Sequence, residues 1–355
     1  MKFIPHKTKL KMMELPRVVM IGQGAVDNVA QTARRLKIGH NALIVNDPRT
    51  HRVAGKRVAQ QLEDDGFFVQ DFKIKGNDEE DVLEVQAIIK ESKMNVLMGV
   101  GGGKPIDIAK YSAFKRGIPF FSIPTAASHD GIASSRATLE IGRMRASVEA
   151  QPPLVLIADT NIIAASPFKL TVSGCGDIIA NHSAVADWML AHRLKGEEYS
   201  NYAAALSSQT AEMLVENIDQ IKPNLEESAR FMLKALVSSG IAMSIAGSSR
   251  PASGSEHMFS HALDLFAKRP ALHGMQCGVG AILMLYLHGL DWRRIKEALK
   301  VVNAPVTAKA LGVSREEVLR ALTYAHKIRP ERYTILGNGI SQRTAEKVAK
   351  ETGVI

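Results

Sequence analysis

The chain has 355 residues, which is enough for two domains with separate hydrophobic cores. Apolar residues make up 46% and charged residues 23%, a composition typical of folded globular proteins. The net charge of +9 comes from scattered basic residues and aromatic residues are only 5%, which argues against a nucleic-acid-binding protein. We expect a small anionic substrate and no nucleic-acid partner.

Export and membrane insertion are not expected from the sequence. Two cysteines exclude a disulfide framework and suit a reducing compartment. The basic start, MKFIPHKTKLKM, lacks the apolar core of a signal peptide, and the longest apolar run, 279–287, is too short to cross a bilayer. We therefore expect a cytoplasmic protein.

The first half of the chain alternates strand-like and helix-like segments. The predicted strands are 17–21, 41–45, 67–72, 95–100, 119–123 and 154–157, and the predicted helices are 28–36, 53–62, 79–92 and 105–115. Such alternation predicts a parallel sheet covered by helices on both faces, a Rossmann-like α/β domain.

A glycine-rich turn, residues 101–107, follows the strand at 95–100 and reads GGGKPID. The glycines let the backbone approach a ligand, and Pro105 suits the first position of the next helix. The free N–H groups and the dipole at that helix start suit a pyrophosphate. It is not a Walker A loop, because Pro105 stands where Ser or Thr is needed. The alternative is a tight strand-to-helix connection without a ligand.

Asp47 ends the second predicted strand, where a carboxylate meets the adenosine ribose of a dinucleotide. The alternative is an Asp that caps the following helix. Arg49, His51 and Arg52 follow at once and could hold a 2′-phosphate. We therefore expect either NAD(H) or NADP(H) as the cofactor.

Small and hydroxyl residues fill the loop that follows the strand at 119–123. Thr125, Ser128 and Ser134 could donate hydrogen bonds to a cofactor, and Asp130 could bind a substrate hydroxyl, because ligands lie at the carboxyl ends of parallel strands. The alternative is a solvated turn.

From Pro167 onward the apolar residues recur at helical spacing. The helices predicted there are 209–221, 226–245, 292–302 and 315–326. We place a domain boundary near Ala165, which gives an α/β domain of residues 1–165 and a helical domain of residues 166–355.

Three histidines gather in the segment 254–280. His257 and His261 are spaced i, i+4, so that on a helix both imidazoles project from one face, and His273 follows on the next loop. We predict the missing ligand at Asp177, at a glycine-rich helix start where the dipole favours a carboxylate. Two imidazoles and one carboxylate leave an open coordination position, as in catalytic zinc sites. The alternatives are a capping Asp177 and histidines without a metal.

Cys175 and Cys277 lie close to these residues in the sequence and could themselves bind the metal. We expect them instead to be small buried packing residues, because Asp and two His already complete a three-ligand set.

Together these motifs resemble those of the archaeal glycerol-1-phosphate dehydrogenases, relatives of iron-containing alcohol dehydrogenases, glycerol dehydrogenases and dehydroquinate synthases. The resemblance covers nearly the whole chain after its N-terminal tail and rests on GGGKPID, TAASHDGIASS, SGCGD, GSEHMFSHAL, LHGMQCGVG and RPERYTIL. It implies metal ligands at Asp177, His257 and His273, substrate contacts at Asp130, Asp177 and His261, of which Asp130 and His261 are catalytic, and cofactor contacts at Gly103, Lys104, Pro105, Ile106, Asp107, Thr125, Ala126, Ala127, Ser128 and Ser134.

The resemblance also implies a reaction, the reduction of dihydroxyacetone phosphate to sn-glycerol 1-phosphate for archaeal ether lipids, and a homo-oligomer. Two positions depart from relatives. Asn181 replaces a histidine that iron-dependent relatives use as a ligand, which favours zinc, and Met275 stands where many relatives carry Glu.

The residues that bind the substrate phosphate are not evident from the motifs, and Lys268, Arg269 and Arg250 are candidates because they flank the histidine segment. A glycerol or other polyol dehydrogenase is the alternative without such a site. A dehydroquinate-synthase-like lyase and a nucleotide-binding regulator without catalysis are further alternatives.

Overall fold

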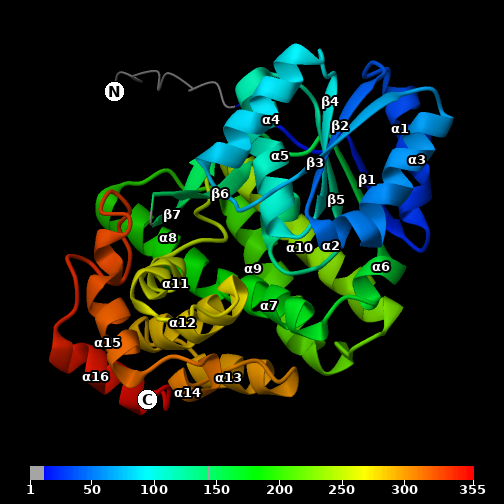
Figure 1. The fold of residues 1–355 in the computed structure, drawn as a ribbon. Helices are drawn as coiled ribbons and strands as arrows, with labels where there is room; N and C mark the ends of the chain where they lie inside the picture. Colours follow the sequence, from blue (N-terminus) through cyan, green and yellow to red (C-terminus); the bar gives the residue numbers. More distant parts are fainter. Residues whose placement is uncertain (1–11, 143) are drawn as a thin grey trace, which may run out of the picture.

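The computed structural model describes residues 12–142 and 144–355 (Figure 1). The basic N-terminal segment, which is not expected to be a signal peptide, falls almost entirely in residues 1–11, outside the described residues.

The α/β half is built on a parallel six-stranded sheet, as the alternating pattern predicts. Its strands are β1 (Val18–Gly22), β2 (Asn41–Asn46), β3 (Phe68–Lys73), β4 (Val96–Gly101), β5 (Phe120–Pro124) and β8 (Val155–Asp159), in the order β1-β8-β5-β4-β2-β3. The central strands β4, β5 and β8 are buried along their whole length, which explains their continuous apolar sequences.

Helices cover both faces of this sheet (Figure 1). They are α1 (Val29–Leu36), α2 (Pro48–Thr50), α3 (Lys56–Asp64), α4 (Glu79–Glu91) and α5 (Gly103–Arg116). Ile44 of β2 packs in a cluster with α1 and α3, whereas Leu43 and Val45 pack in a second cluster with α4 and α5. Alternate residues of one strand therefore pack into two separate hydrophobic cores, one on each face of the sheet.

The helical half follows from residue 160. Its helices are α6 (Thr160–Ala164), α7 (Phe168–Ile179), α8 (Asn181–Lys195), α9 (Asn201–Glu216), α10 (Glu226–Ala246), α11 (Ser255–Phe266), α12 (His273–Leu287), α13 (Trp292–Val301), α14 (Ala308–Leu311), α15 (Arg315–Tyr324) and α16 (Gln342–Glu351). Helix α10 is long and apolar enough to cross a membrane, but 61% of its most apolar window is buried. It is the core helix against which α6, α7 and α9 pack.

A hairpin of β6 (Arg136–Ile141) and β7 (Met144–Glu149) was not predicted. It packs against α5 (Figure 1). The predicted helix at 53–62 also differs, because a π-helical turn, His51–Gly55, precedes α3. The boundary near Ala165 stays a prediction: α6 ends there, yet one hydrophobic cluster runs from the sheet into the C-terminal helices.

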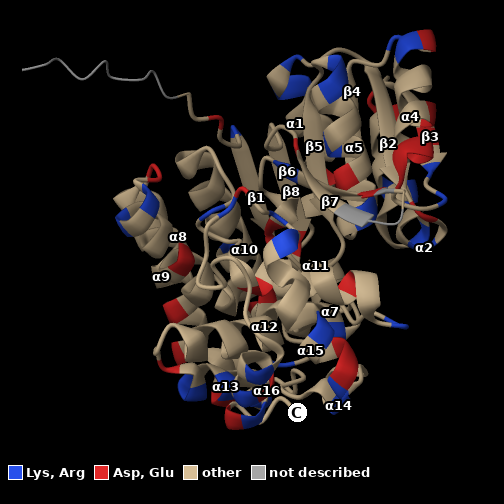
Figure 2. Ribbon diagram, turned by 90° about the vertical axis from the view of Figure 1, so that its left-hand side faces the viewer, with Lys and Arg blue, Asp and Glu red and all other residues tan. Residues whose placement is uncertain are grey.

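Lys and Arg are interspersed with Asp and Glu over both halves (Figure 2). The net charge of +9 is therefore not gathered in one basic segment of the ribbon.

Candidate active site

Close backbone packing brings α7 against the start of α12. A Cβ atom on Gly176 would lie 2.1 Å from the carbonyl oxygen of Gly274, and a Cβ on Gly274 would lie 1.8 Å from that of Ser173. Only glycine fits at both positions. The glycines around Asp177 therefore serve helix packing. The predicted helix start is wrong, because Asp177 lies in the last turn of α7.

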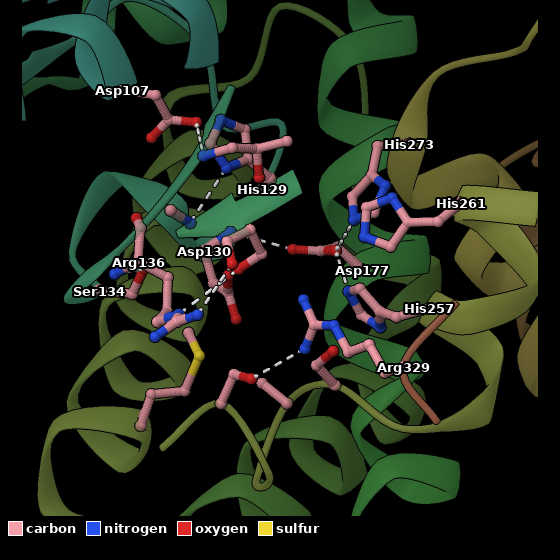
Figure 3. Close-up of a pocket in the computed structure, with 17 residues that line it drawn as sticks. Asp107, His129, Asp130, Ser134, Arg136, Asp177, His257, His261, His273 and Arg329 are labelled. Atoms are coloured by element: carbon pink, nitrogen blue, oxygen red, sulfur yellow. Dashed lines mark hydrogen bonds and ion pairs between the residues drawn. The ribbon is translucent and has the colours of Figure 1, made fainter. Parts of the chain in front are cut away.

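This packing assembles four potential metal ligands, Asp177, His257, His273 and Cys277, whose donor atoms all lie within 4.8 Å of one another. Asp177 Oδ1 is 3.6 Å from His257 Nε2 and 3.8 Å from His273 Nε2 (Figure 3). Cys277 Sγ is 3.5 Å from His273 Nε2. Tetrahedral zinc with bonds of about 2.0–2.3 Å places its ligands about 3.3–3.8 Å apart. The donor set and its spacing therefore fit zinc, while the role of each residue stays a prediction.

Two of the four potential ligands, His273 and Asp177, are already in the protonation state that binds a metal. Burial, with a contribution from His257, lowers the pKa of His273 to about 3, so its imidazole is neutral. Burial opposes ionisation of Asp177, but its hydrogen bond to His257 and the charges of both histidines hold its pKa below the usual value. Burial raises the pKa of the Cys277 thiol to about 11. Burial opposes protonation of His257, but Cys277, Asp177 and Glu256 raise its pKa well above the usual value, so His257 and Cys277 would each lose a proton on binding a metal.

Both cysteines are buried, as expected: Cys175 packs against Met232, and Cys277 packs with Ala180 and Ala281. Cys277 also belongs to the group of potential ligands, the alternative that the sequence left open.

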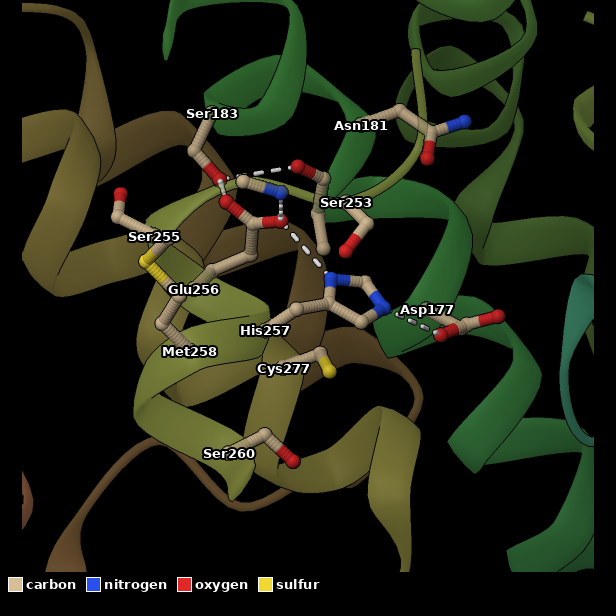
Figure 4. Close-up of polar contacts among 12 residues, drawn as sticks. Asp177, Asn181, Ser183, Ser253, Ser255, Glu256, His257, Met258, Ser260 and Cys277 are labelled. Atoms are coloured by element: carbon tan, nitrogen blue, oxygen red, sulfur yellow. Dashed lines mark hydrogen bonds and ion pairs between the residues drawn. The ribbon is translucent and has the colours of Figure 1, made fainter. Parts of the chain in front are cut away.

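Glu256 is a fully buried carboxylate directly before His257, and the sequence reading missed it. It accepts hydrogen bonds from the Gly254 amide at 2.6 Å and from Ser183 Oγ at 2.8 Å, and it lies 2.8 Å from His257 Nδ1 (Figure 4). Because a carboxylate only accepts, His257 Nδ1 donates the proton of this contact, and Nε2 is the ring nitrogen that faces Asp177. Glu256 thus fixes the tautomer that metal binding needs.

His261 lines the cavity next to this group without belonging to it. It lies one turn after His257 on α11, and its ring centroid is 5.6 Å from that of His273. Burial lowers the pKa of His261. Its contact with a substrate, which the resemblance implies, stays a prediction.

Asp130 faces the same cavity from the sheet side (Figure 3). Its amide donates to Asp177 Oδ2 at 2.9 Å, and its carboxylate accepts from Ser239 Oγ at 2.8 Å. Burial and the neighbouring Asp177 raise the pKa of Asp130 to about 7. Ser239 also accepts from Asn181 at 3.2 Å, so Asn181 braces Asp130 and is not in the ligand group. Met275 packs against the core.

A second groove, of about 520 Å³, lies at the carboxyl ends of the strands. Asp47, Thr125 and Ala126 line it with Gly102 and Arg49, as a dinucleotide site requires. Asp47 also caps α2, accepting from the amides of Arg49 and Thr50 at 2.8 and 2.9 Å, so the capping alternative holds as well.

The other predicted cofactor residues divide into three sets. Gly103, Lys104 and Pro105 form the first turn of α5. Ile106 and Ala127 are fully buried in the core, Ser128 is half-buried beside it, and Asp107 and Ser134 line the metal cavity instead of the groove. Gly103 lies between residues of the two cavities: Gly102 before it lines the groove, and a Cβ atom on Gly103 would lie 2.4 Å from Nε2 of His129, a residue of the metal cavity that was not predicted.

The phosphate candidates from the sequence lie elsewhere. Arg250 is buried, forms an ion pair with Glu197 and donates to the Tyr333 carbonyl at 2.9 Å. Lys268 and Arg269 are exposed and do not line the cavity. Two other arginines, Arg136 and Arg329, line it instead. Two sequence features could have pointed to these arginines. Arg136 begins the alternating apolar pattern of residues 136–141, which is typical of a strand, and Arg329 is the first residue of the RPERYTIL motif.

Comparison with known proteins gives one consistent result. Residues 20–167 match the iron-containing alcohol dehydrogenase family. The chain is 52% identical over 355 residues, the full length of both chains, to glycerol-1-phosphate dehydrogenase [NAD(P)+] of Methanosarcina acetivorans. It is 51% identical over 347 residues, 98% of this chain and 99% of the other, to the enzyme of that name from Thermococcus sibiricus.

Solved structures share the fold at low sequence identity. A probable glycerol dehydrogenase from Sinorhizobium meliloti matches with a TM-score of 0.78 and 18% identity, over 97% of this chain and 98% of that one. The NADH-dependent butanol dehydrogenase A of Thermotoga maritima matches with a TM-score of 0.76 and 16% identity, over 96% and 98% of the two chains. These matches establish the architecture of an α/β domain followed by a helical domain.

Proposed function

The chain belongs to the glycerol-1-phosphate dehydrogenases within the iron-containing alcohol dehydrogenase family, and we propose that it reduces dihydroxyacetone phosphate reversibly to sn-glycerol 1-phosphate. It is an NAD(P)-dependent oxidoreductase that acts on a CH–OH group. The observation that carries the proposal is the group of Asp177, His257 and His273 in one cavity, whose residue His129 packs against Gly103, the residue after Gly102 of the cofactor groove. The product would be the backbone of ether phospholipids.

In this proposal Asp177, His257 and His273 hold zinc, and Glu256 keeps His257 in the required tautomer. A metal held there would supply positive charge to stabilise the negative charge on the C2 oxygen of the substrate, and a bound nicotinamide would supply the hydride. His261 lies beside this position and moves a proton to or from that oxygen.

Asp130 contributes by binding a substrate hydroxyl across the cavity from His261. Its position is fixed twice, by the backbone bond to Asp177 and by the side-chain bond to Ser239. With Asp130 held in this way, Asp130 and His261 orient the substrate from opposite sides before the reaction, and such positioning is a large part of catalysis.

On the cofactor side, the first turn of α5 offers free N–H groups to the pyrophosphate, and Asp47 and Arg49 lie where the adenosine ribose would bind. This arrangement is proposed to accept both NADH and NADPH. We also propose residues 1–165 and 166–355 as the cofactor-binding domain and the metal- and substrate-binding domain, a cytoplasmic location without membrane insertion, and a homo-oligomer.

The test is an assay of dihydroxyacetone phosphate reduction by zinc-loaded protein with NADH and with NADPH, followed by chiral analysis of the product. We expect turnover with both cofactors and the sn-1 enantiomer. No reduction with either cofactor, or formation of the sn-3 enantiomer, would reject the proposal. Glycerol or polyol dehydrogenase activity is not favoured, since the full-length relatives at 52% identity carry the phosphorylated product in their name.

A further inference from the structure

Two arginines point into the cavity that holds the potential metal ligands. Arg136 is the first residue of β6, and Arg329 follows the 3-10 turn Ala325–Lys327. Figure 3 shows their guanidinium groups on the two sides of the cavity, below Asp130 and Asp177. The hairpin and the C-terminal segment, far apart in sequence, thus meet at the active site.

Both arginines have hydrogen-bond donors to spare. Within residues 12–142 and 144–355, neither forms an ion pair with a carboxylate. Arg136 donates to Ser147, at 3.4 Å to Oγ and 2.9 Å to the carbonyl oxygen. Arg329 donates to Ser249 Oγ at 3.4 Å. Because a guanidinium carries five N–H donors, each keeps several for a ligand. Glu149, opposite Arg136 in the hairpin, is exposed to solvent.

Two further arginines add positive charge behind this pair. Arg332 donates to Ser249 Oγ at 2.9 Å and to the Ser253 carbonyl at 2.6 Å. Burial, and then the neighbouring guanidinium groups, lower the pKa of Arg332 to about 9. Arg250 is neutralised by Glu197.

Burial lowers the pKa of Arg136 and Arg329, and the charges of Glu149 and Glu331 oppose this shift. In the described residues neither arginine has a carboxylate in ion-pair contact, so a bound anion would add a direct partner for both.

The position of Arg136 is fixed by the helix that begins at the cofactor loop. Lys110 of α5 is fully buried, and its Nζ donates to the carbonyl oxygens of Gly131 at 2.5 Å and Arg136 at 2.6 Å. The same Nζ lies 3.3 Å from Asp107 Oδ1. The backbone at Arg136 is therefore held before any ligand arrives, so less ordering is needed when the ligand binds.

We propose that Arg136 and Arg329 form the phosphate-binding site that selects a phosphorylated triose over its unphosphorylated counterpart. The inference rests on the proposed function and names the residues that give its specificity. Guanidinium groups match the oxygens of phosphate with paired hydrogen bonds. Ser249 and Ser253 line the same wall and can add hydroxyl donors. The phosphate end then fixes the distance of the C2 carbonyl from the metal ligands.

The test compares dihydroxyacetone phosphate with dihydroxyacetone, which carries the same carbonyl without the charge. kcat and KM are measured for Arg136→Met, Arg329→Met and Arg136→Lys, with Arg294→Met as the control because Arg294 is half-exposed and paired with Glu212. Each Met variant is expected to lower the kcat/KM ratio of the two substrates about ten- to a hundredfold, mainly through KM for the phosphate ester. Arg136→Lys should lie between, since lysine keeps the charge and loses the paired geometry.

Zinc content and melting temperature are measured on every variant, so that loss of the metal or of the fold is recognised. An unchanged ratio in both Met variants overturns the proposal, as does an equal loss on both substrates. If the wild type does not reduce dihydroxyacetone phosphate, the proposed function fails, and calorimetric titration with inorganic phosphate still tests the site. Phosphate binding that is lost in both Met variants supports the site, and binding that persists in them overturns it.

Discussion

At the metal end of the cavity the side chains are already bonded to one another, whereas at the arginine end most donors are free. His257 is held by Glu256, and Asp177 by the amide of Asp130. Arg136 and Arg329 touch serines and no carboxylate in the part of the chain that the structure describes. The metal end is therefore a preformed site for a small cation, whereas the arginine end binds an anion that each substrate molecule brings.

The two ends also differ in how far their geometry depends on the backbone. The metal end depends on glycine-mediated packing of α7 on α12, so changes there should affect metal content, activity and stability together. The arginine end extends from a hairpin and a connecting segment, so changes there should affect selectivity alone. This contrast between the two ends can be tested by the following changes, of which metal removal should have the largest effect on activity.

Metal removal should abolish reduction of dihydroxyacetone phosphate. A chelator in excess is expected to lower kcat at least about a thousandfold, because a metal Lewis acid contributes several kcal/mol and about 1.4 kcal/mol corresponds to tenfold. Zinc should restore the activity of the wild type, and should not restore that of Asp177→Asn or His273→Ala. Atomic absorption gives the metal content of each sample. Full activity in metal-free protein would contradict the account.

Gly274→Ala should separate α7 from α12. The new Cβ would meet the Ser173 carbonyl at 1.8 Å, and backbone cannot yield as a flexible side chain can. Overpacking of this kind costs about 3 kcal/mol, so we expect a loss of that size in denaturant unfolding together with a loss of bound zinc. Gly22→Ala is the matched control, because its Cβ meets nothing within 4 Å. Equal stability of the two variants would show that the close packing is unimportant.

Glu256→Gln should weaken zinc binding while keeping a polar side chain of nearly the same size beside His257. The carboxylate fixes the tautomer of His257, and loss of such a partner typically weakens metal affinity about ten- to a hundredfold. Competition with a chromophoric chelator measures the affinity. Glu212→Gln, a carboxylate that pairs with Arg294 away from the cavity, is the control and should bind zinc as the wild type does. Unchanged affinity in Glu256→Gln would remove Glu256 from the metal site.

Arg250→Met should behave unlike the changes at Arg136 and Arg329. Arg250 is paired with Glu197 and bonded to the Tyr333 carbonyl, so its loss leaves partners unsatisfied and should cost about 1–3 kcal/mol of unfolding free energy. The preference for dihydroxyacetone phosphate should stay as in the wild type, in assays well below the melting temperature. A loss of that preference would place Arg250 in the phosphate site and would contradict the distinction between Arg250 and the pair Arg136 and Arg329.

The regular elements could be predicted from the sequence because their signals are local. Buried strands such as β4 give continuous apolar runs, and α10 gives a helical pattern over its length. The β6–β7 hairpin has a local signal too, the alternation of Ala137, Leu139 and Ile141, but the preceding loop of small residues obscured it.

The site was predictable only where chemistry and spacing coincide. The i, i+4 spacing of His257 and His261 predicts that both face one side of a helix, but it does not predict that His261 lies outside the ligand group. That distinction depends on where α12 places His273, which is a matter of tertiary packing. Arg136 and Arg329 meet only when the chain folds, so proximity in sequence pointed instead to Lys268, Arg269 and Arg250, none of which lines the cavity.

The most direct test of the account is the ratio of kcat/KM for dihydroxyacetone phosphate to that for dihydroxyacetone, measured on the zinc-loaded wild type with a saturating reduced cofactor. With zinc and two charged phosphate contacts in one cavity, the ratio should be at least about a hundred, since each such contact contributes about 1.5–3 kcal/mol. A ratio near one would contradict the central claim that the metal ligands and the arginines form a single site for a phosphorylated triose.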